Sequence, residues 1–160
     1  MPNCLRARLW LGVALLLSGA LTAQASAAEA PLATIPVTIE TANGTRVIQA
    51  EVACKLEDRM RGLMGRESLA PDSGMIFFLP KPRPMRMWMK DTPLALDLVF
   101  FDKDRKIILL ARNATPNSEA IVESGGAVIG VLEIAGGRAT EIGISPGDRL
   151  LYSYPQGTCE

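Results

Sequence analysis

The chain has 160 residues and carries 17 basic and 17 acidic side chains, so its formal net charge at pH 7 is zero. This balance predicts no basic surface of the kind that binds nucleic acid. The sequence has no histidine, which removes the commonest general base and the commonest protein ligand of transition metals. Composition therefore argues against a nucleic-acid partner and against many classes of enzyme.

The amino terminus has the pattern of an export signal. Arg6 and Arg8 are followed by an apolar run, LWLGVALLL, at residues 9–17, and this order of charge and hydrophobicity is that of a secretory signal peptide. Small residues at alternate positions after the run predict cleavage after Ala25 or Ala27. A membrane-spanning helix needs about 20 apolar residues, so we expect contact with a membrane only through the signal segment before cleavage.

Cleavage after Ala27 removes residues 1–27 and leaves residues 28–160 as a single domain. A chain of that length buries enough apolar surface to fold without disulfides. Loss of two arginines leaves 15 basic against 17 acidic side chains, a net charge of −2. We expect this mature domain to be periplasmic or secreted.

Two cysteines, Cys54 and Cys159, remain in the predicted mature domain. Thiols in an oxidising compartment tend to pair. Cys54 also lies at a predicted junction between a strand and a helix, where a small buried thiol is equally natural. The sequence leaves open a Cys54–Cys159 disulfide and a pair of free thiols.

The first half of the domain predicts a hairpin, a helix and a strand. Apolar residues alternate at 35–39 and again at 48–52, on either side of Asn43-Gly44, which is typical of a β-hairpin. Apolar residues at positions 56, 60, 63 and 64 precede Gly65 and predict one short amphipathic helix. The run GMIFFL at 74–79 predicts a strand, and PKPRP at 80–84 predicts an extended surface loop because proline cannot donate to a ladder.

The second half is a series of strands. They are predicted at residues 85–89, 94–101, 106–111, 127–134 and 149–154, with an irregular loop at 113–126 and a helical turn at 138–143. The segment LALDLVFF at 94–101 is nearly continuous in its hydrophobicity, which predicts burial on both faces. The whole pattern predicts an α+β domain that is mostly β: a strongly curved, antiparallel-rich sheet or partial barrel of about seven strands with one short amphipathic helix.

Six short motifs run in one order along residues 35–154: RGLM at 61–64, GMIF at 74–77, WMKDT at 88–92, LALDLVFFD at 94–102, VLEI at 131–134 and GD at 147–148. In these motifs the chain resembles the DUF192 family across the predicted mature domain. The resemblance implies a compact β-rich fold with a helix near its start, and it implies no established activity. The chain departs from the family pattern at Asp91, where asparagine is usual, and at Gly65, where an aromatic residue often follows Gly-Leu-Met.

Carboxylates interrupt two of the apolar strands. Asp97 and Glu133 each lie within an apolar run, and an unpaired carboxylate in a core is costly. We therefore predict that both converge at one rim of the sheet near Trp88, where a structural ion pair or capping network is the preferred interpretation. Ligand binding in one polar pocket is the second interpretation, with Trp88, Lys90, Asp91, Thr92, Asp97 and Glu133 as candidate ligand-binding residues. A pair of catalytic carboxylates acting on a glycosidic bond is the third. No residue is assigned a catalytic role.

Methionine is concentrated in one predicted strand. Met85, Met87 and Met89 alternate along it, with Trp88 on the other face. Thioethers are soft ligands that suit Cu(I), but methionine also fills irregular gaps in cores. Packing is the preferred interpretation, so these three residues are weak candidates for metal ligands and no cofactor is predicted.

The sequence thus favours a non-enzymatic periplasmic binding or accessory protein whose partner is a small ligand, a glycan or an envelope protein. The alternatives are a hydrolase of envelope glycans that uses Asp97 and Glu133, and a methionine-rich Cu(I)-binding protein. The positions of Asp97 and Glu133 distinguish the first two, because catalytic carboxyl groups must face one cleft about 5 to 10 Å apart.

Overall fold

A computed structural model describes residues 31–153. The chain divides into two units after Ala30, and every described residue belongs to the second unit. The predicted signal peptide, its cleavage sites and Cys159 lie outside the described residues. Within residues 31–153, no helix is long and apolar enough to cross a membrane.

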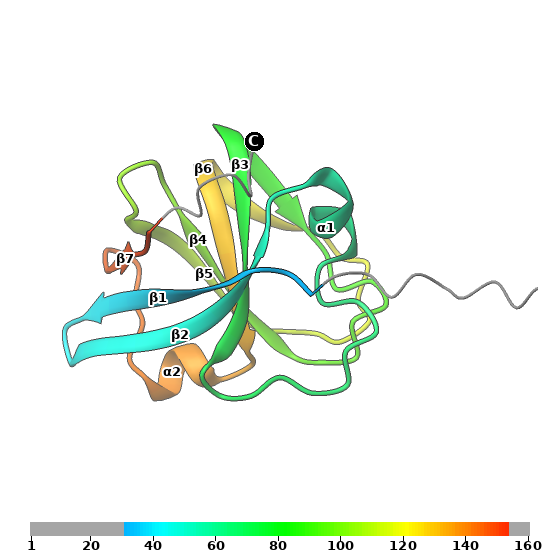
Figure 1. The fold of residues 1–160 in the computed structure, drawn as a ribbon, viewed down its shortest axis with the longest axis horizontal. Helices are drawn as coiled ribbons and strands as arrows, with labels where there is room; N and C mark the ends of the chain where they lie inside the picture. The colour runs from blue at the N-terminus through cyan, green and yellow to red at the C-terminus, as the bar shows by residue number, and fades with distance from the viewer. Residues whose placement is uncertain (1–30, 154–160) are drawn as a thin grey trace, which may run out of the picture. The chain divides into compact units, whose positions relative to one another are not determined.

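The described part of the chain is built on one seven-stranded sheet with strand order β5-β4-β6-β3-β2-β1-β7 (Figure 1). The elements are β1 (Thr34–Thr41), β2 (Gly44–Ala53), α1 (Leu56–Arg61), β3 (Ser73–Met87), β4 (Leu96–Phe101), β5 (Ile107–Ala114), β6 (Val122–Ala135), α2 (Arg138–Glu141) and β7 (Arg149–Leu151). Neighbouring strands are antiparallel except β2 and β3, which are parallel and are connected through α1.

The sheet curls until its two edges meet. Lys106, directly before β5, pairs with Arg149 of β7, and the Ile107 N–H donates to the carbonyl of Asp148 at 2.8 Å. The main chains at the two edges therefore partly satisfy each other's hydrogen bonds, which limits the exposed edge. The predicted fold class, a mostly β domain with a strongly curved sheet, is confirmed.

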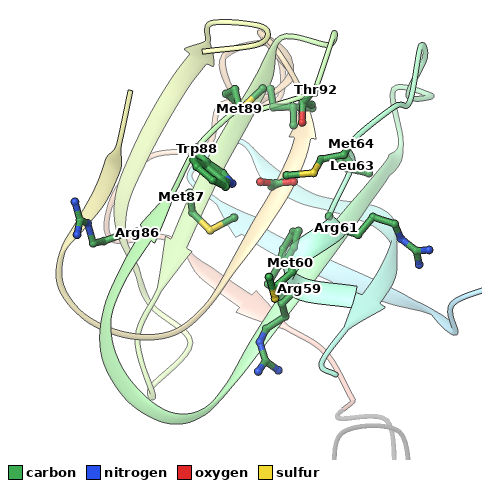
Figure 2. A pocket seen from close by; sticks show the side chains of 14 residues that line it. Arg59, Met60, Arg61, Leu63, Met64, Arg86, Met87, Trp88, Met89 and Thr92 are labelled. Carbon is green, nitrogen blue, oxygen red and sulfur yellow. The ribbon is translucent and has the colours of Figure 1, made fainter. Parts of the chain in front are cut away.

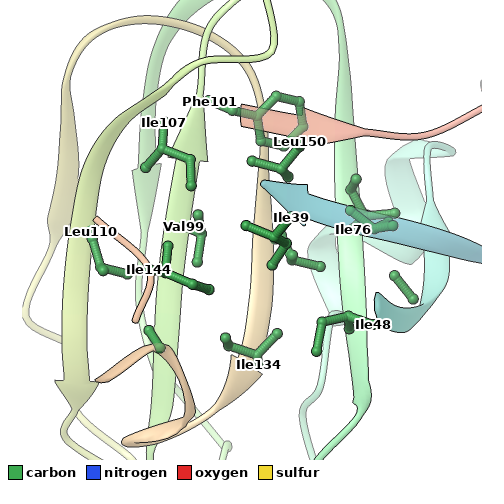
Figure 3. Close-up of a cluster of buried hydrophobic side chains, with 14 of the residues drawn as sticks. Ile39, Ile48, Ile76, Val99, Phe101, Ile107, Leu110, Ile134, Ile144 and Leu150 are labelled. Atoms are coloured by element: carbon green, nitrogen blue, oxygen red, sulfur yellow. The ribbon is translucent and has the colours of Figure 1, made fainter. Parts of the chain in front are cut away.

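Apolar side chains form one cluster on each face of the sheet. Successive residues of a strand point to opposite faces, so β4 places Val99 and Phe101 in the first cluster and Leu98 and Phe100 in the second. Figure 3 shows the first cluster inside the curl of the sheet, with side chains from β1, β2, β3 and β6 meeting those of β4 and β5. All six residues of β4 are buried, as the apolar run predicted.

The hairpin prediction is confirmed and the helix prediction is wrong in its details. Thr41 pairs with Gly44 across a two-residue turn, and Gly44 has a φ of 104°. Helix α1 ends at Arg61, because Gly62 takes a φ of 51° that breaks the helical path. Leu56 and Met60 are 63% and 68% exposed, so their side of the helix does not face the core. The helical spacing of these apolar residues could not show whether their side of α1 faces the core or the rim of a pocket.

The proline-rich segment is also more regular than predicted. Residues 80–84 are exposed and extended, as expected, but they belong to a continuous β3. The ladder to β6 is interrupted between Phe78 and Arg83 and resumes with Arg83 opposite Val128. The alternate prolines break the ladder only locally.

Candidate functional site

Asp97 is a structural carboxylate. It is fully buried in β4, and its two oxygens accept hydrogen bonds from the backbone N–H groups of Asn113, at 2.7 Å, and Ala139, at 2.8 Å. Asn113 lies in β5 and Ala139 lies in the first turn of α2, where backbone N–H groups lack partners inside the helix. Asp97 therefore joins β4, β5 and α2, which is the capping alternative considered from the sequence.

Asp97 and Glu133 lie on opposite faces of the sheet. In the ladder between β4 and β6, Asp97 is opposite Ile134 and Leu98 is opposite Glu133. Paired residues share a face and sequence neighbours do not, so the two carboxyl groups point away from each other. The predicted convergence is wrong, and a paired-carboxylate hydrolase site at these residues has no geometric basis.

Glu133 lines a pocket on the face of the second apolar cluster. Its cross-strand neighbours Met75 and Leu98 both belong to that cluster. The residue is 4% exposed, and the described part of the chain offers its carboxyl no hydrogen bond or ion pair. Burial raises the pKa of Glu133 to about 8, because the surroundings disfavour the charged form. The carboxyl is therefore mostly protonated at neutral pH.

The pocket, of about 160 Å³, has walls from two distant segments (Figure 2). Residues 59–64, from α1 and the turn after it, form one wall. Residues 86–89, at the end of β3, form the opposite wall together with Thr92, while Phe77 and Leu96 come from the sheet. The lining is mostly apolar with a buried carboxyl group, which is the usual composition of a small-molecule site.

The turn at residues 88–92 shapes the mouth of this pocket. Trp88 is 44% exposed, and the Lys90 ammonium lies 5.4 Å from the centroid of its ring in a cation–π contact. Thr92 is buried, and its hydroxyl donates to the Lys90 carbonyl at 3.0 Å. The Asn117 N–H donates to the Thr92 carbonyl and the Met89 N–H to the Ser118 carbonyl. The loop after β5 therefore holds the turn in place.

The two departures from the family pattern meet across the mouth. Asp91 has a φ of 51° and Gly65 a φ of 73°, and the Gly65 N–H donates to the Asp91 carbonyl at 2.8 Å. Left-handed backbone is tolerated by glycine, asparagine and aspartate better than by other residues. Aspartate can thus keep the backbone conformation that asparagine would adopt, and the resulting hydrogen bond joins the two walls of the pocket.

The structure brings three of the six predicted ligand-binding residues together: Trp88, Thr92 and Glu133 line the pocket. Lys90 contacts the ring of Trp88, and Asp91 has an exposed side chain and contributes its carbonyl to the bridge. Asp97 lies on the other face.

The methionines are divided by the structure. Met87 and Met89 line the pocket, and Met89 is also a buried member of the second apolar cluster. Met85 belongs to that cluster but does not line the pocket. Sequence reasoning missed Met60 and Met64, which line the opposite wall, because it assigned them to the core face of a helix. The RGLM motif at 61–64 was the signal that could have placed Met64 at a site.

No three side chains among the described cysteine, aspartate and glutamate residues lie together as a metal site. Cys54 is disulfide-bonded. Its predicted partner, Cys159, lies outside the described residues, so that pairing stays a prediction.

The sequence profile of DUF192, described as "Uncharacterized ACR", matches residues 38–152. The chain belongs to the DUF192 family. A search of curated proteins gives no match.

Two solved structures are similar to this DUF192 protein. One, from Sinorhizobium meliloti 1021 and provisionally described as a transcription regulator, is 42% identical, with a TM-score of 0.76 over 78% of this chain and 98% of that one. The other, a protein of unknown function from Novosphingobium aromaticivorans DSM 12444, is 37% identical, with a TM-score of 0.74 over 75% of this chain and 86% of that one. These likenesses support the fold and the family and bring no established activity.

Proposed function

We propose that this DUF192 protein is a non-enzymatic periplasmic binding protein that holds a small ligand in the pocket lined by Glu133. The observation that carries the proposal is the buried Glu133 carboxyl, which has no partner in the described part of the chain although it opens onto an apolar pocket. A buried polar group without a hydrogen bond costs stability. Polar groups held at such a cost are characteristic of functional sites.

The contrast with Asp97 supports a binding role for Glu133. Asp97 is buried to a similar extent, and both of its oxygens accept backbone hydrogen bonds. The fold therefore provides hydrogen-bond donors to a carboxylate that has a structural role. Glu133 lacks such donors in the described part of the chain, and a bound ligand would provide its carboxyl with a partner.

Binding is favoured over catalysis by the other polar groups around the pocket. The Thr92 hydroxyl is engaged with the Lys90 carbonyl. Arg59 donates to the carbonyls of Cys54 and Phe78, and Arg61 is 3.7 Å from the carboxylate of Asp58. No described lining residue is a nucleophile with a base beside it, an arrangement that covalent catalysis requires.

The periplasmic part of the proposal is supported by the sequence of residues 1–27, with its basic start, short apolar run and small-residue cleavage sites. An oxidising compartment also agrees with a disulfide-bonded Cys54.

A thermal-shift screen of the mature protein tests the binding role. The panel contains sugars, peptidoglycan fragments, organic amines and metal ions, and a ligand at 100 times its Kd is expected to stabilise the fold by about 2.7 kcal/mol. Glu133→Gln keeps the shape of the side chain and is expected to abolish the shift. Glu40→Gln, at an exposed position of β1, is the matched control and should leave it unchanged. If no compound shifts the wild type more than Glu133→Gln, the pocket is not a binding site.

A further inference from the structure

We infer that the ligand of this pocket is a monovalent thiophilic metal ion, Cu(I) or its analogue Ag(I), held by methionine thioethers with Glu133 as the counter-ion. This inference names the ligand class of the proposed binding site and rests on that proposal.

The first observation is the gathering of methionines from both walls. The sequence contains seven methionines, and four of them line this one pocket: Met60 and Met64 from the α1 side, and Met87 and Met89 from the β3 side. Figure 2 shows Met64 and Met87 reaching from opposite walls into the space beside Trp88. Two segments more than 20 residues apart thus place thioethers around one cavity.

Core packing accounts for Met89, which is 2% exposed in the second apolar cluster, but not for Met60, Met64 and Met87. A methionine that fills a core gap is enclosed on all sides, as Met85 is, with 8% of its surface exposed. Met60 is 68% exposed, and Met64 and Met87 are half-buried. Their side chains border an open cavity, where a thioether remains available as a soft ligand.

The charge of the site selects a monovalent ion. Glu133 supplies one negative charge when ionised, so an ion of charge +1 forms a neutral buried pair with it, whereas a divalent ion would leave a net charge in an apolar pocket. Hard divalent ions also require several oxygen ligands. An organic ammonium group needs hydrogen-bond acceptors, and thioethers are weak ones.

The arginines at the rim do not oppose a cation inside. Arg59 and Arg61 are held by the contacts described above, and Arg86 is 3.4 Å from the Glu123 carboxylate. Figure 2 shows the three guanidinium groups turned outward from the pocket. The Arg59 guanidinium is thus engaged by backbone carbonyls, while the Arg61 and Arg86 side chains are 45% and 67% exposed, so solvent screens their charges.

Trp88 provides a direct probe of the site. The chain has two tryptophans, Trp10 and Trp88, and Trp10 falls in the predicted signal peptide. Trp88 is thus the sole tryptophan of the predicted mature domain, and it lines the pocket. An Ag(I) or Cu(I) ion bound there is expected to quench its fluorescence.

The test is a titration of the mature, disulfide-intact protein with Ag(I) in chloride-free buffer, and with Cu(I) delivered by a competing chelator under nitrogen. Trp88 fluorescence gives stoichiometry and affinity, and NMR of methionine methyl groups labelled with carbon-13 identifies the ligands without any mutation. We expect one ion per chain with sub-micromolar affinity. Met64 and Met87 methyl signals should shift while that of Met85 does not.

Matched variants complete the design. Met64→Leu and Met87→Leu nearly conserve volume and are expected to weaken binding at least tenfold, while Met85→Leu, on the same strand but outside the pocket, should bind as the wild type does. Glu133→Gln should weaken binding, because it removes the negative charge that pairs with the ion. Binding that is unchanged in Met64→Leu and Met87→Leu overturns the inference. If neither ion binds but an organic compound gives a shift that depends on Glu133, the metal inference is wrong and the proposed function stands; if nothing binds, both are wrong.

Discussion

The change Glu133→Gln is expected to remove a pH dependence of stability that burial of the carboxyl creates. Burial raises the pKa from 4.5 to about 8. Between these values the unfolded chain has lost the proton and the folded chain keeps it, so the unfolded state binds fewer protons and stability falls as pH rises. Each pH unit lowers the free energy of unfolding by about 1.4 kcal/mol. The loss at pH 7 is about 3 kcal/mol, and it is complete above about pH 8.

A neutral amide does not titrate, so the stability of the variant lacks this dependence on pH. Glutamine has its own cost when its amide is unpaired, about 1 to 3 kcal/mol, but that cost is the same at every pH. The observable is therefore the difference in unfolding free energy between Glu133→Gln and the wild type. We expect this difference to increase by about 4 kcal/mol in favour of the variant between pH 5 and pH 8.

Urea melts of both proteins at pH 5, 6, 7 and 8 in metal-free buffer measure this difference. Titration of all other groups is common to the two proteins and cancels. Glu40→Gln, which changes an exposed carboxylate, should follow the wild type to within about 0.5 kcal/mol at each pH. Parallel profiles for Glu133→Gln and the wild type would refute the reasoning, because they would show that the carboxyl ionises in the folded protein as it does in the unfolded chain.

Three further outcomes are expected. Asp97→Asn should destabilise the fold by about 1 to 3 kcal/mol in urea melts, because an acceptor of two backbone N–H groups is replaced by an amide with one acceptor oxygen; unchanged stability would contradict its structural role. Gly62→Ala should lower the free energy of unfolding by more than about 1 kcal/mol in the same assay, because Gly62 has a φ of 51° and a new Cβ would lie 3.3 Å from an aromatic ring. Unchanged stability would show that α1 need not end at this position. The intact mass of the exported protein should correspond to a chain that begins after Ala25 or Ala27, and a mass that retains the first 23 residues would disprove cleavage.

Local patterns predicted those parts of the fold that depend on local physics. The tight turn at residues 42–43 is followed by Gly44, whose φ of 104° is accessible to glycine without strain. The continuous apolar run of β4 requires burial on both faces, and both apolar clusters receive its side chains. The family motifs predicted membership of the DUF192 family, which the profile match over residues 38–152 confirms.

The site depended on information that a single sequence does not contain. Whether Asp97 and Glu133 share a face is decided by the register of β4 against β6, and a shift of one residue would have put them on the same side. The environment of Met60 was equally beyond reach, because helical spacing places it on the same side as Leu56 without showing what covers that side. Register and covering elements are set by contacts between distant segments.

The two buried carboxyl groups show why burial alone is a poor guide to function. Both interrupt apolar strands that pair with each other, and from the sequence they are equivalent. Asp97 accepts two backbone hydrogen bonds, so an acid-to-amide change there should destabilise the protein. Glu133 has no such partner in the described part of the chain, so the same change should become favourable as pH rises. At pH 8 the two acid-to-amide substitutions should therefore change the free energy of unfolding with opposite signs. That result would show that Asp97 stabilises the fold and that Glu133 is buried at a cost to it.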